Sequence, residues 1–230
     1  MKSKIFLIPL ALILALAVGC GIYLESYYRA EPEALALAED MEGDLVWAPE
    51  DAETGLIFYP GGKVDPAAYA PLMEALADRG ILCVVTEMPF HLAVFDVDAA
   101  AGIQAEFPGV ERWYIGGHSL GGSMAAAYLE GCEEDYEGLI LLAAYSTADL
   151  SESPLEVLSV YGSEDLVLDR ENYGDYLGNL PGEFRELVID GGCHAGFGMY
   201  GTQDGDGIPV ITSEEQIAIT AETIAEMVGA

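Results

Sequence analysis

The chain has 230 residues, of which 52% are hydrophobic, and its 40 acidic residues against eight basic ones give a formal net charge of −32. This length and apolar content suit one α/β domain with a single sizeable core, rather than two domains or a disordered chain. Beyond residue 30, 39 acidic residues face only five basic ones, so we expect no nucleic acid partner.

An almost uninterrupted apolar run covers residues 5–24 and follows Lys2 and Lys4. At about 1.5 Å per residue, a helix of this length can cross a hydrocarbon core of about 30 Å, so the run indicates a membrane-targeting segment. We expect a retained single-pass anchor that leaves the acidic domain on the extracytoplasmic side. Two alternatives stay open: a signal peptide that is removed, and a lipoprotein signal in which residues 17–19 precede an acylated Cys20.

The segment after the run leads into the domain. Three tyrosines stand where an interfacial aromatic belt is expected, namely Tyr23, Tyr27 and Tyr28. An Ala/Glu-rich stretch from Ala30 to Asp40 then predicts a short helix or stalk. The chain therefore divides into an anchor or signal segment at 1–29, a linker at 30–43 and a globular domain at 44–230.

The domain alternates short apolar segments with amphipathic ones. Strands are expected at 44–48, 55–59, 81–87, 112–116, 138–144, 155–161 and 184–189. Helices are expected at 66–79, 97–106, 119–130, 169–177 and 213–227. This alternation predicts an α/β fold with a mostly parallel central sheet and helices on both faces.

A glycine-rich turn joins the strand expected at 112–116 to the helix expected at 119–130. Its sequence is Gly-Gly-His-Ser-Leu-Gly-Gly over residues 116–122, which contains the GxSxG pattern of a nucleophile elbow. A Cβ at Gly117 or Gly121 would strike a neighbouring strand or helix, and the sharp turn points the hydroxyl of Ser119 out of the sheet edge. We therefore predict that Ser119 is a catalytic nucleophile.

A serine hydroxyl needs an imidazole to take its proton, and the chain contains three histidines. His194 follows the last expected strand, where a flexible loop at the carboxyl edge can carry a base, and we predict that it is the base. His118 adjoins the nucleophile and is expected to pack or form hydrogen bonds instead. His91 follows an earlier strand, so it is a candidate for lining the site.

The acid is expected between the serine and the histidine in chain order. The strand at 155–161 is followed by Gly-Ser-Glu-Asp, and from this loop Asp165 can reach back to His194. Glu164 and Asp149 remain alternatives, because carboxylates are abundant throughout the chain.

The negative oxygen of a tetrahedral intermediate requires preorganised N–H donors. We predict one from the backbone of Leu120, which directly follows the nucleophile. The second is expected from the loop Pro-Gly-Gly-Lys at 60–63, and we choose Gly62. Lys63, the only lysine beyond residue 4, either adds a cation beside this oxygen or is a solvated turn residue.

These segments resemble the α/β-hydrolase superfamily, and residues 56–63, 115–122 and 191–194 look like its family 5 branch. The resemblance covers about residues 44–228 and implies an α/β-hydrolase fold with Ser119, Asp165 and His194 as a catalytic triad. The sequence departs from many relatives at Tyr59-Pro60, where they carry His-Gly. The short connection from Tyr145 to Pro154 leaves no room for a large cap, so we expect an open site.

We predict no cofactor and no metal from the cysteines or from the acidic turn near the C-terminus. The cysteines Cys20, Cys83, Cys132 and Cys193 lack CxxC spacing, and a thiol nucleophile at Cys193 is a minor alternative. The turn Asp-Gly-Asp-Gly at 204–207 resembles a calcium loop but continues with Ile208 and Pro209 where a ligand and a glycine are required.

The combined prediction is a membrane-tethered serine hydrolase that cleaves small acyl esters or related acyl bonds through an acyl-enzyme on Ser119. Two alternatives stay open: an acyltransferase that uses the same triad, and a catalytically silent domain that acts as a binding module at the cell surface.

Overall fold

The computed structural model describes residues 14, 16, 18–21, 23–38, 41 and 43–230. More than half of the apolar run at 5–24 lies outside these residues, as does part of the linker predicted at 30–43. Within the described part of the chain, no helix is both long enough and apolar enough to cross a membrane.

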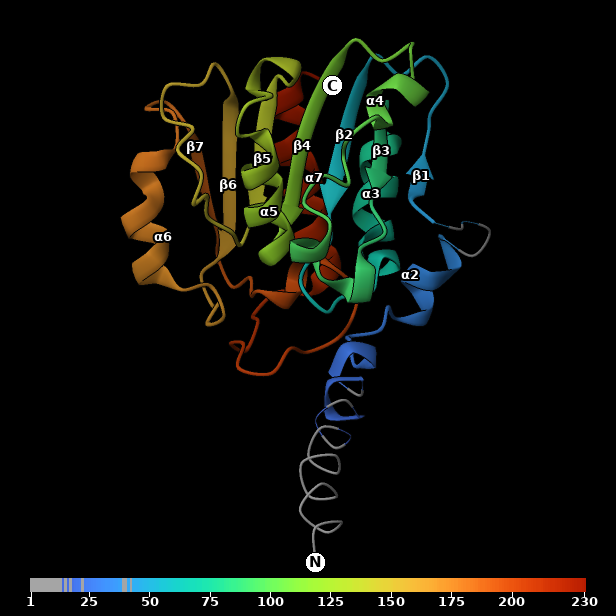
Figure 1. Ribbon diagram of the computed structural model, residues 1–230, viewed down its shortest axis with the longest axis vertical. Coiled ribbons are helices and arrows are strands. Elements are labelled where there is room, and N and C mark those ends of the chain that lie inside the picture. Colours follow the sequence, from blue (N-terminus) through green and yellow to red (C-terminus); the bar gives the residue numbers. More distant parts are fainter. Residues whose placement is uncertain (1–13, 15, 17, 22, 39–40, 42) are drawn as a thin grey trace, which may run out of the picture.

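A seven-stranded sheet with the strand order β1-β3-β2-β4-β5-β6-β7 forms the centre of the domain (Figure 1). The strands are β1 (Leu45–Trp47), β2 (Thr54–Tyr59), β3 (Ile81–Val85), β4 (Arg112–His118), β5 (Gly138–Leu142), β6 (Glu156–Gly162) and β7 (Arg185–Ile189). Among these described strands, β1 alone pairs antiparallel with its neighbour. All seven predicted strands are present, and the mostly parallel sheet is confirmed.

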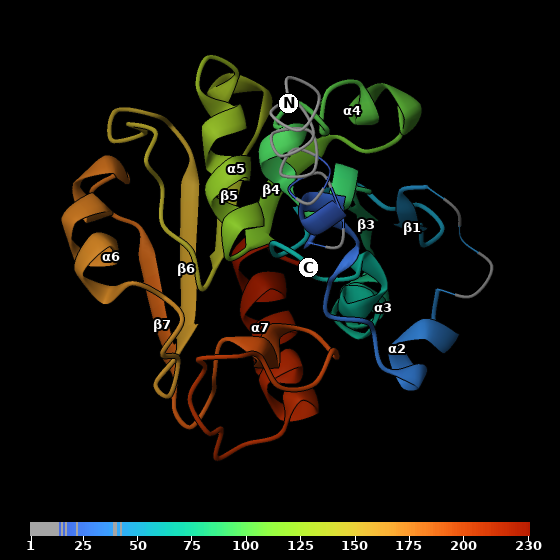
Figure 2. The same ribbon diagram turned by 60° about the horizontal axis from the view of Figure 1, so that its bottom comes forward.

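Helices cover both faces of the sheet, as predicted. The described helices are α2 (Pro32–Ala36), α3 (Ala70–Ala77), α4 (Ile103–Glu106), α5 (Leu120–Leu129), α6 (Arg170–Tyr176) and α7 (Ser213–Val228). Figure 2 shows α3 and α7 on one side of the sheet and α5 on the other. Every residue of β2 is buried, and two successive residues of the strand, Ile57 and Phe58, belong to separate apolar clusters on the two faces. A strand covered on both faces is expected to be buried along its length and mostly apolar in this way.

One predicted helix, at 97–106, is much shorter in the structure, where only Ile103–Glu106 is helical. The preceding residues form turns. The N–H of Ala100 donates to the buried hydroxyl of Tyr59 at 2.8 Å, and Gly102 adopts a left-handed φ of 89°. These contacts prevent a continuous helix from forming over the predicted range.

Local signals set the ends of the other helices. In α7, Thr212 and Glu215 form a capping box at the start, and Gly229 ends the helix with a φ of 72°. The helix predicted at 66–79 is divided into a 3₁₀ turn, η1 (Pro66–Tyr69), and α3.

The carboxyl ends of the parallel strands meet at the lower edge of the sheet in Figure 1, where the blue N-terminal segment also joins the domain. The loops beyond these strand ends are the usual place for a ligand site in an open α/β sheet. Within the predicted linker, Ala30 and Ala34 are buried in the core, so this part of the chain packs on the domain.

Candidate active site

Ser119 lies at the turn between β4 and α5, with φ 53° and ψ −124°. A positive φ strains a residue that carries a side chain. A Cβ on Gly117 would lie 2.6 Å from the carbonyl oxygen of Tyr59, and one on Gly121 would collide with the carbonyl oxygens of Tyr59 and Pro60. The two glycines therefore permit the close approach of β2, β4 and α5, and Ser119 carries the strain of the turn.

His194 and Asp165 form a buried pair, with only 1% and 2% of each residue exposed. The distance from His194 Nδ1 to Asp165 Oδ2 is 2.9 Å. Asp165 Oδ1 accepts hydrogen bonds from the backbone N–H groups of Val167, at 2.9 Å, and Leu168, at 2.8 Å. All four groups come from loops that follow β6 and β7, which brings the acid and the histidine together at one edge.

The electrostatics of this pair favour an ionised carboxylate. Burial pushes the pKa of Asp165 upward, but His194 and the backbone N–H groups outweigh burial and leave the pKa below its ordinary value. A carboxylate accepts only, so the neutral His194 ring carries its proton on Nδ1 and leaves Nε2 as the basic nitrogen. Nε2 is buried and has no hydrogen-bond partner among the described residues.

The two alternative acids make other contacts. Asp149 is exposed and accepts hydrogen bonds from the backbone and hydroxyl of Ser151. Glu164 accepts from the hydroxyl of Ser163 at 3.0 Å. Of the three candidate carboxylates, Asp165 is the one that contacts His194.

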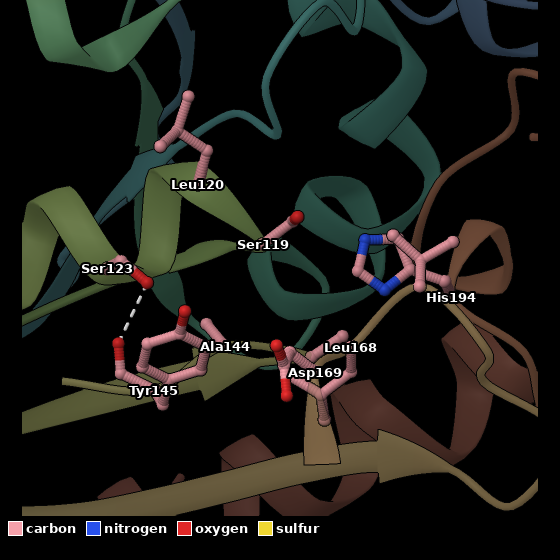
Figure 3. Close-up of a pocket in the computed structure, with 10 residues that line it drawn as sticks. Ser119, Leu120, Ser123, Ala144, Tyr145, Leu168, Asp169 and His194 are labelled. Carbon is pink, nitrogen blue, oxygen red and sulfur yellow. Dashed lines mark hydrogen bonds between the residues drawn. The ribbon is translucent and has the colours of Figure 1, made fainter. Parts of the chain in front are cut away.

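Ser119 and His194 line one cavity of about 250 Å³. Its wall is formed by Ser119, Leu120, Ser123, Ala143, Ala144, Tyr145, Val167, Leu168, Asp169 and His194. Figure 3 shows the hydroxyl of Ser119 pointing toward the imidazole of His194. Residues 143–155, which connect β5 to β6, form no helix or strand, so this connection contributes no folded cap over the cavity.

The loop at residues 60–63, here called the oxyanion loop, follows β2 and passes beside the start of α5. Proline at its first position has no N–H. The N–H of Gly61 donates to the Tyr69 hydroxyl at 2.9 Å, and the N–H of Lys63 donates to the His91 carbonyl oxygen at 2.6 Å. Three of the four positions therefore have no N–H available for a substrate.

Gly62 is the remaining position, and its N–H has no acceptor among the described residues. A Cβ on Gly62 would lie 3.0 Å from Leu120 Cδ2, so the loop lies directly against the residue after Ser119. Leu120 is the first residue of α5, where backbone N–H groups have no partner within the helix. The two predicted donor residues, Gly62 and Leu120, are therefore neighbours, although Gly62 is not part of the wall of the cavity that Ser119 lines.

His118 is fully buried behind the site. Its Nδ1 and the Tyr69 hydroxyl are hydrogen-bonded at 2.8 Å, and its ring centroid lies 4.6 Å from that of His194. Burial, and secondly the proximity of His194, hold the pKa of His118 well below its ordinary value. His118 is therefore a neutral buried residue that connects through Tyr69 to Gly61 in the oxyanion loop.

The two predicted site-lining residues do not lie in the cavity wall. The Nζ of Lys63 donates to the backbone carbonyl of Leu24 at 2.7 Å, away from Ser119. The ring of His91 stacks on Tyr27 with 3.9 Å between centroids. Both side chains instead contact the segment that precedes the domain.

Two residues that brace His194 were not predicted from the sequence. Gln216 on α7 is buried, accepts from the N–H of Cys193 at 3.0 Å and donates to its carbonyl at 2.9 Å. Asp206 accepts from the N–H of Ala195 at 2.9 Å. The sequence signal that could have indicated Gln216 is its position as a polar residue on the apolar face of the predicted helix at 213–227.

The other candidate chemistries have little support from the geometry. Burial, with a further contribution from Asp206, raises the pKa of the Cys193 thiol to about 11, so the thiol is protonated at neutral pH. The four cysteines are all free. The part of the chain that the structure describes contains no cluster of three His, Cys, Asp or Glu side chains suited to a metal ion.

Residues 55–218 match the sequence profile described as the alpha/beta hydrolase family, which is more than half of the chain. This chain belongs to the α/β-hydrolase family. The predicted resemblance is therefore confirmed, and the observed sheet order and elbow are those of an α/β-hydrolase fold. None of the curated proteins matches the chain.

Solved structures of esterases share this fold. Est1E from Butyrivibrio proteoclasticus superposes with a TM-score of 0.62 and 14% identity, covering 81% of this chain and 94% of Est1E. The thermophilic esterase Est2 from the Planctomycetes species Thermogutta terrifontis gives a TM-score of 0.57 and 19% identity, covering 81% of this chain and 87% of Est2. At identities this low, the similarity shows a shared fold and does not show a shared substrate.

Proposed function

We propose that this α/β-hydrolase cleaves esters or related acyl bonds, with Ser119 as nucleophile, His194 as base and Asp165 as the acid of the triad. One observation carries the proposal. A single cavity contains the strained Ser119 and the imidazole of His194, whose Nε2 has no partner among the described residues while Nδ1 binds Asp165. A base oriented by a carboxylate beside a nucleophile is the arrangement required for acyl transfer.

The proposed reaction has two halves. Ser119 Oγ attacks the acyl carbon while His194 Nε2 takes the hydroxyl proton, and the carbonyl electrons move onto oxygen. The tetrahedral intermediate then collapses, the bond to the leaving oxygen breaks, and that oxygen takes the proton from Nε2. Water repeats the sequence on the acyl-enzyme, which releases the carboxylic acid and restores the Ser119 hydroxyl.

The backbone N–H groups of Leu120 and Gly62 are proposed to stabilise the oxyanion. Support comes from the packing of Gly62 against the Leu120 side chain and from the absence of another acceptor for the Gly62 N–H among the described residues. Removal of one such donor typically costs about 2.7–4 kcal/mol in other hydrolases. The hydrogen bond between Gly61 and Tyr69 fixes the loop so that Gly62 is held in place.

The proposed substrate class is small neutral acyl esters. The cavity of about 250 Å³ suits a small acyl group, and no folded cap is inserted in the connection between β5 and β6. Asp169 lies in its wall, and the formal net charge of the chain is −32. Both features disfavour a negatively charged substrate.

We further propose that the hydrolase is tethered to a membrane with its domain on the extracytoplasmic side. The support is the apolar run at 5–24 behind Lys2 and Lys4. Fractionation of cells that express the full chain tests this proposal. Soluble protein that begins after residue 24 would indicate cleavage, and a mature chain that begins at an acylated Cys20 would indicate a lipoprotein.

A panel of p-nitrophenyl acyl esters tests the enzymatic proposal on the purified full chain. Turnover is expected for the natural chain and for Ser151→Ala, a control on the loop between β5 and β6. Ser119→Ala is expected to lose turnover, because triad residues act as a unit. Equal turnover by Ser119→Ala would overturn the proposal, and inactivity of the natural chain on the whole panel would favour a silent binding module. Transfer of the acyl group to an added alcohol in preference to water would identify an acyltransferase.

A further inference from the structure

The segment from Tyr23 to Glu31, here called the N-terminal clamp, is bonded to the loop that carries Gly62. Tyr28 forms a parallel bridge with Val64. The N–H of Tyr28 donates to the Lys63 carbonyl at 2.7 Å, and the Tyr28 carbonyl accepts from the N–H of Asp65 at 2.9 Å. The clamp thus adds backbone pairing at the exit of the oxyanion loop.

The clamp also holds the side chain of Lys63. The ammonium donates to the Leu24 carbonyl at 2.7 Å and lies 5.0 Å from the centre of the Tyr23 ring. The backbone of Lys63 is left-handed, with φ 61°. A strained non-glycine residue persists only when its surroundings impose the conformation, and the clamp contacts both its carbonyl and its side chain.

A second strained residue beside the oxyanion loop has the same support. His91 has φ 56°, and its carbonyl accepts the N–H of Lys63 at 2.6 Å. Its ring stacks on Tyr27 of the clamp, with 3.9 Å between centroids and 30° between planes. The two left-handed residues are therefore bonded to each other, and each contacts the clamp.

The other contacts of the clamp reach the loop that follows His194. The N–H of Glu31 donates to the Met199 carbonyl at 2.8 Å. The N–H of Asp204 donates to the Tyr28 hydroxyl at 3.2 Å, and the Tyr28 and Tyr200 rings are 5.7 Å apart. One short segment therefore bridges the loop that carries Gly62 and the loop that follows His194, at the edge that Figure 2 brings forward.

We propose that the N-terminal clamp is a positioning element of the active site, which fixes Gly62 relative to His194 and Ser119. The proposal rests on the hydrolase function proposed above and extends it to residues outside the family match at 55–218. It also assigns Lys63 and His91 a role as positioning residues that act through the oxyanion loop. The reaction itself remains with the triad and the two N–H donors.

A double-mutant cycle on the full chain tests the clamp, with p-nitrophenyl acetate as the probe. Lys63→Met removes the bond to Leu24, and Tyr28→Ala removes the ring and hydroxyl that reach Tyr200 and Asp204. Misplacement of a catalytic group by about 1 Å can cost up to about a hundredfold in rate, so we expect each change to lower kcat about tenfold and KM to change less than about twofold. The double variant is expected to match the single variants, because both changes release the same element.

The controls separate positioning from general damage and from charge. Arg79→Met removes an exposed cation beyond the end of α3 and is expected to leave kcat unchanged. Lys63→Arg keeps a donor for the Leu24 carbonyl and is expected to restore most of kcat. Hydrogen exchange is expected to quicken at residues 61–65 in both single variants, while most of the sheet stays protected.

Two results would overturn the clamp. One is a kcat of Lys63→Met equal to that of the natural chain. The other is a loss of about a hundredfold in kcat of the double variant, since independent effects multiply. If Tyr28→Ala does not fold, the comparison of Lys63→Met with Arg79→Met and Lys63→Arg decides the question. A third pattern separates the two proposals: the natural chain is active, Ser119→Ala is inactive, and the clamp variants keep the natural kcat. That pattern refutes the positioning role of the clamp and leaves the hydrolase proposal intact.

Discussion

Replacement of Asp165 by asparagine changes one atom of the proposed triad and has a consequence that follows from its hydrogen bonds. Oδ1 of Asp165 accepts two backbone N–H groups, so the amide oxygen of the variant takes that place. The amide NH₂ then faces Nδ1 of His194, which must accept a hydrogen bond there instead of donating one. The proton of the neutral ring moves to Nε2, and His194 no longer accepts the proton of Ser119.

The expected loss in kcat is about 10⁴-fold, the size of the effect of this change in a serine protease triad. It corresponds to about 5.4 kcal/mol in the activation free energy. The fold is expected to survive, because both backbone N–H groups keep an acceptor.

The assay is steady-state hydrolysis of p-nitrophenyl acetate by Asp165→Asn and by the matched control Glu164→Gln, whose carboxylate contacts Ser163. Only Asp165→Asn is expected to lose kcat by orders of magnitude, with thermal unfolding close to that of the natural chain. The reasoning is refuted if kcat of Asp165→Asn stays within about tenfold of the natural value, or if the two variants lose kcat equally.

Three other predictions concern pH, packing and charge. Burial lowers the pKa of His118, so the unfolded chain binds a proton at this residue more tightly than the folded chain does. The free energy of unfolding, measured by urea titration, should therefore fall as the pH drops below about 6.5, and His118→Gln should flatten that dependence. Tyr69→Phe leaves the N–H of Gly61 and Nδ1 of His118 unpaired and should cost about 1–3 kcal/mol in the free energy of unfolding for each group, measured by urea titration; no loss would contradict the network. A neutral ester should exceed a matched ester with a distal carboxylate in kcat/KM at low salt, with a smaller gap at high salt; a salt-independent preference for the anionic ester would contradict the charge argument.

The features predicted from the sequence are those set by neighbours along the chain. The elbow around Ser119 requires glycine at two nearby positions, and the order of strands and loops puts Asp165 and His194 after β6 and β7. These signals are local and periodic, so they are readable without a structure.

The features that were missed depend on contacts between distant segments. The hydroxyl of Tyr69 reaches His118, 49 positions away, and Lys63 reaches Leu24, 39 positions away. The sequence shows Lys63 as the only lysine beyond residue 4, which suggested a cation for the oxyanion, but not the direction of its side chain. Likewise, part of the helix predicted at 97–106 forms turns instead, because the N–H of Ala100 donates to the buried hydroxyl of Tyr59. No local sequence pattern indicates this hydrogen bond.

The central claim is that Ser119 is the nucleophile, and covalent labelling with a fluorophosphonate probe tests it most directly. After reaction of the purified full chain, proteolysis and mass spectrometry locate the phosphonylated residue. The expected result is one adduct on Ser119 that is absent from Ser119→Ala and much slower to form in Asp165→Asn. No adduct on the natural chain, or an adduct on another residue such as Cys193, would contradict the proposed mechanism.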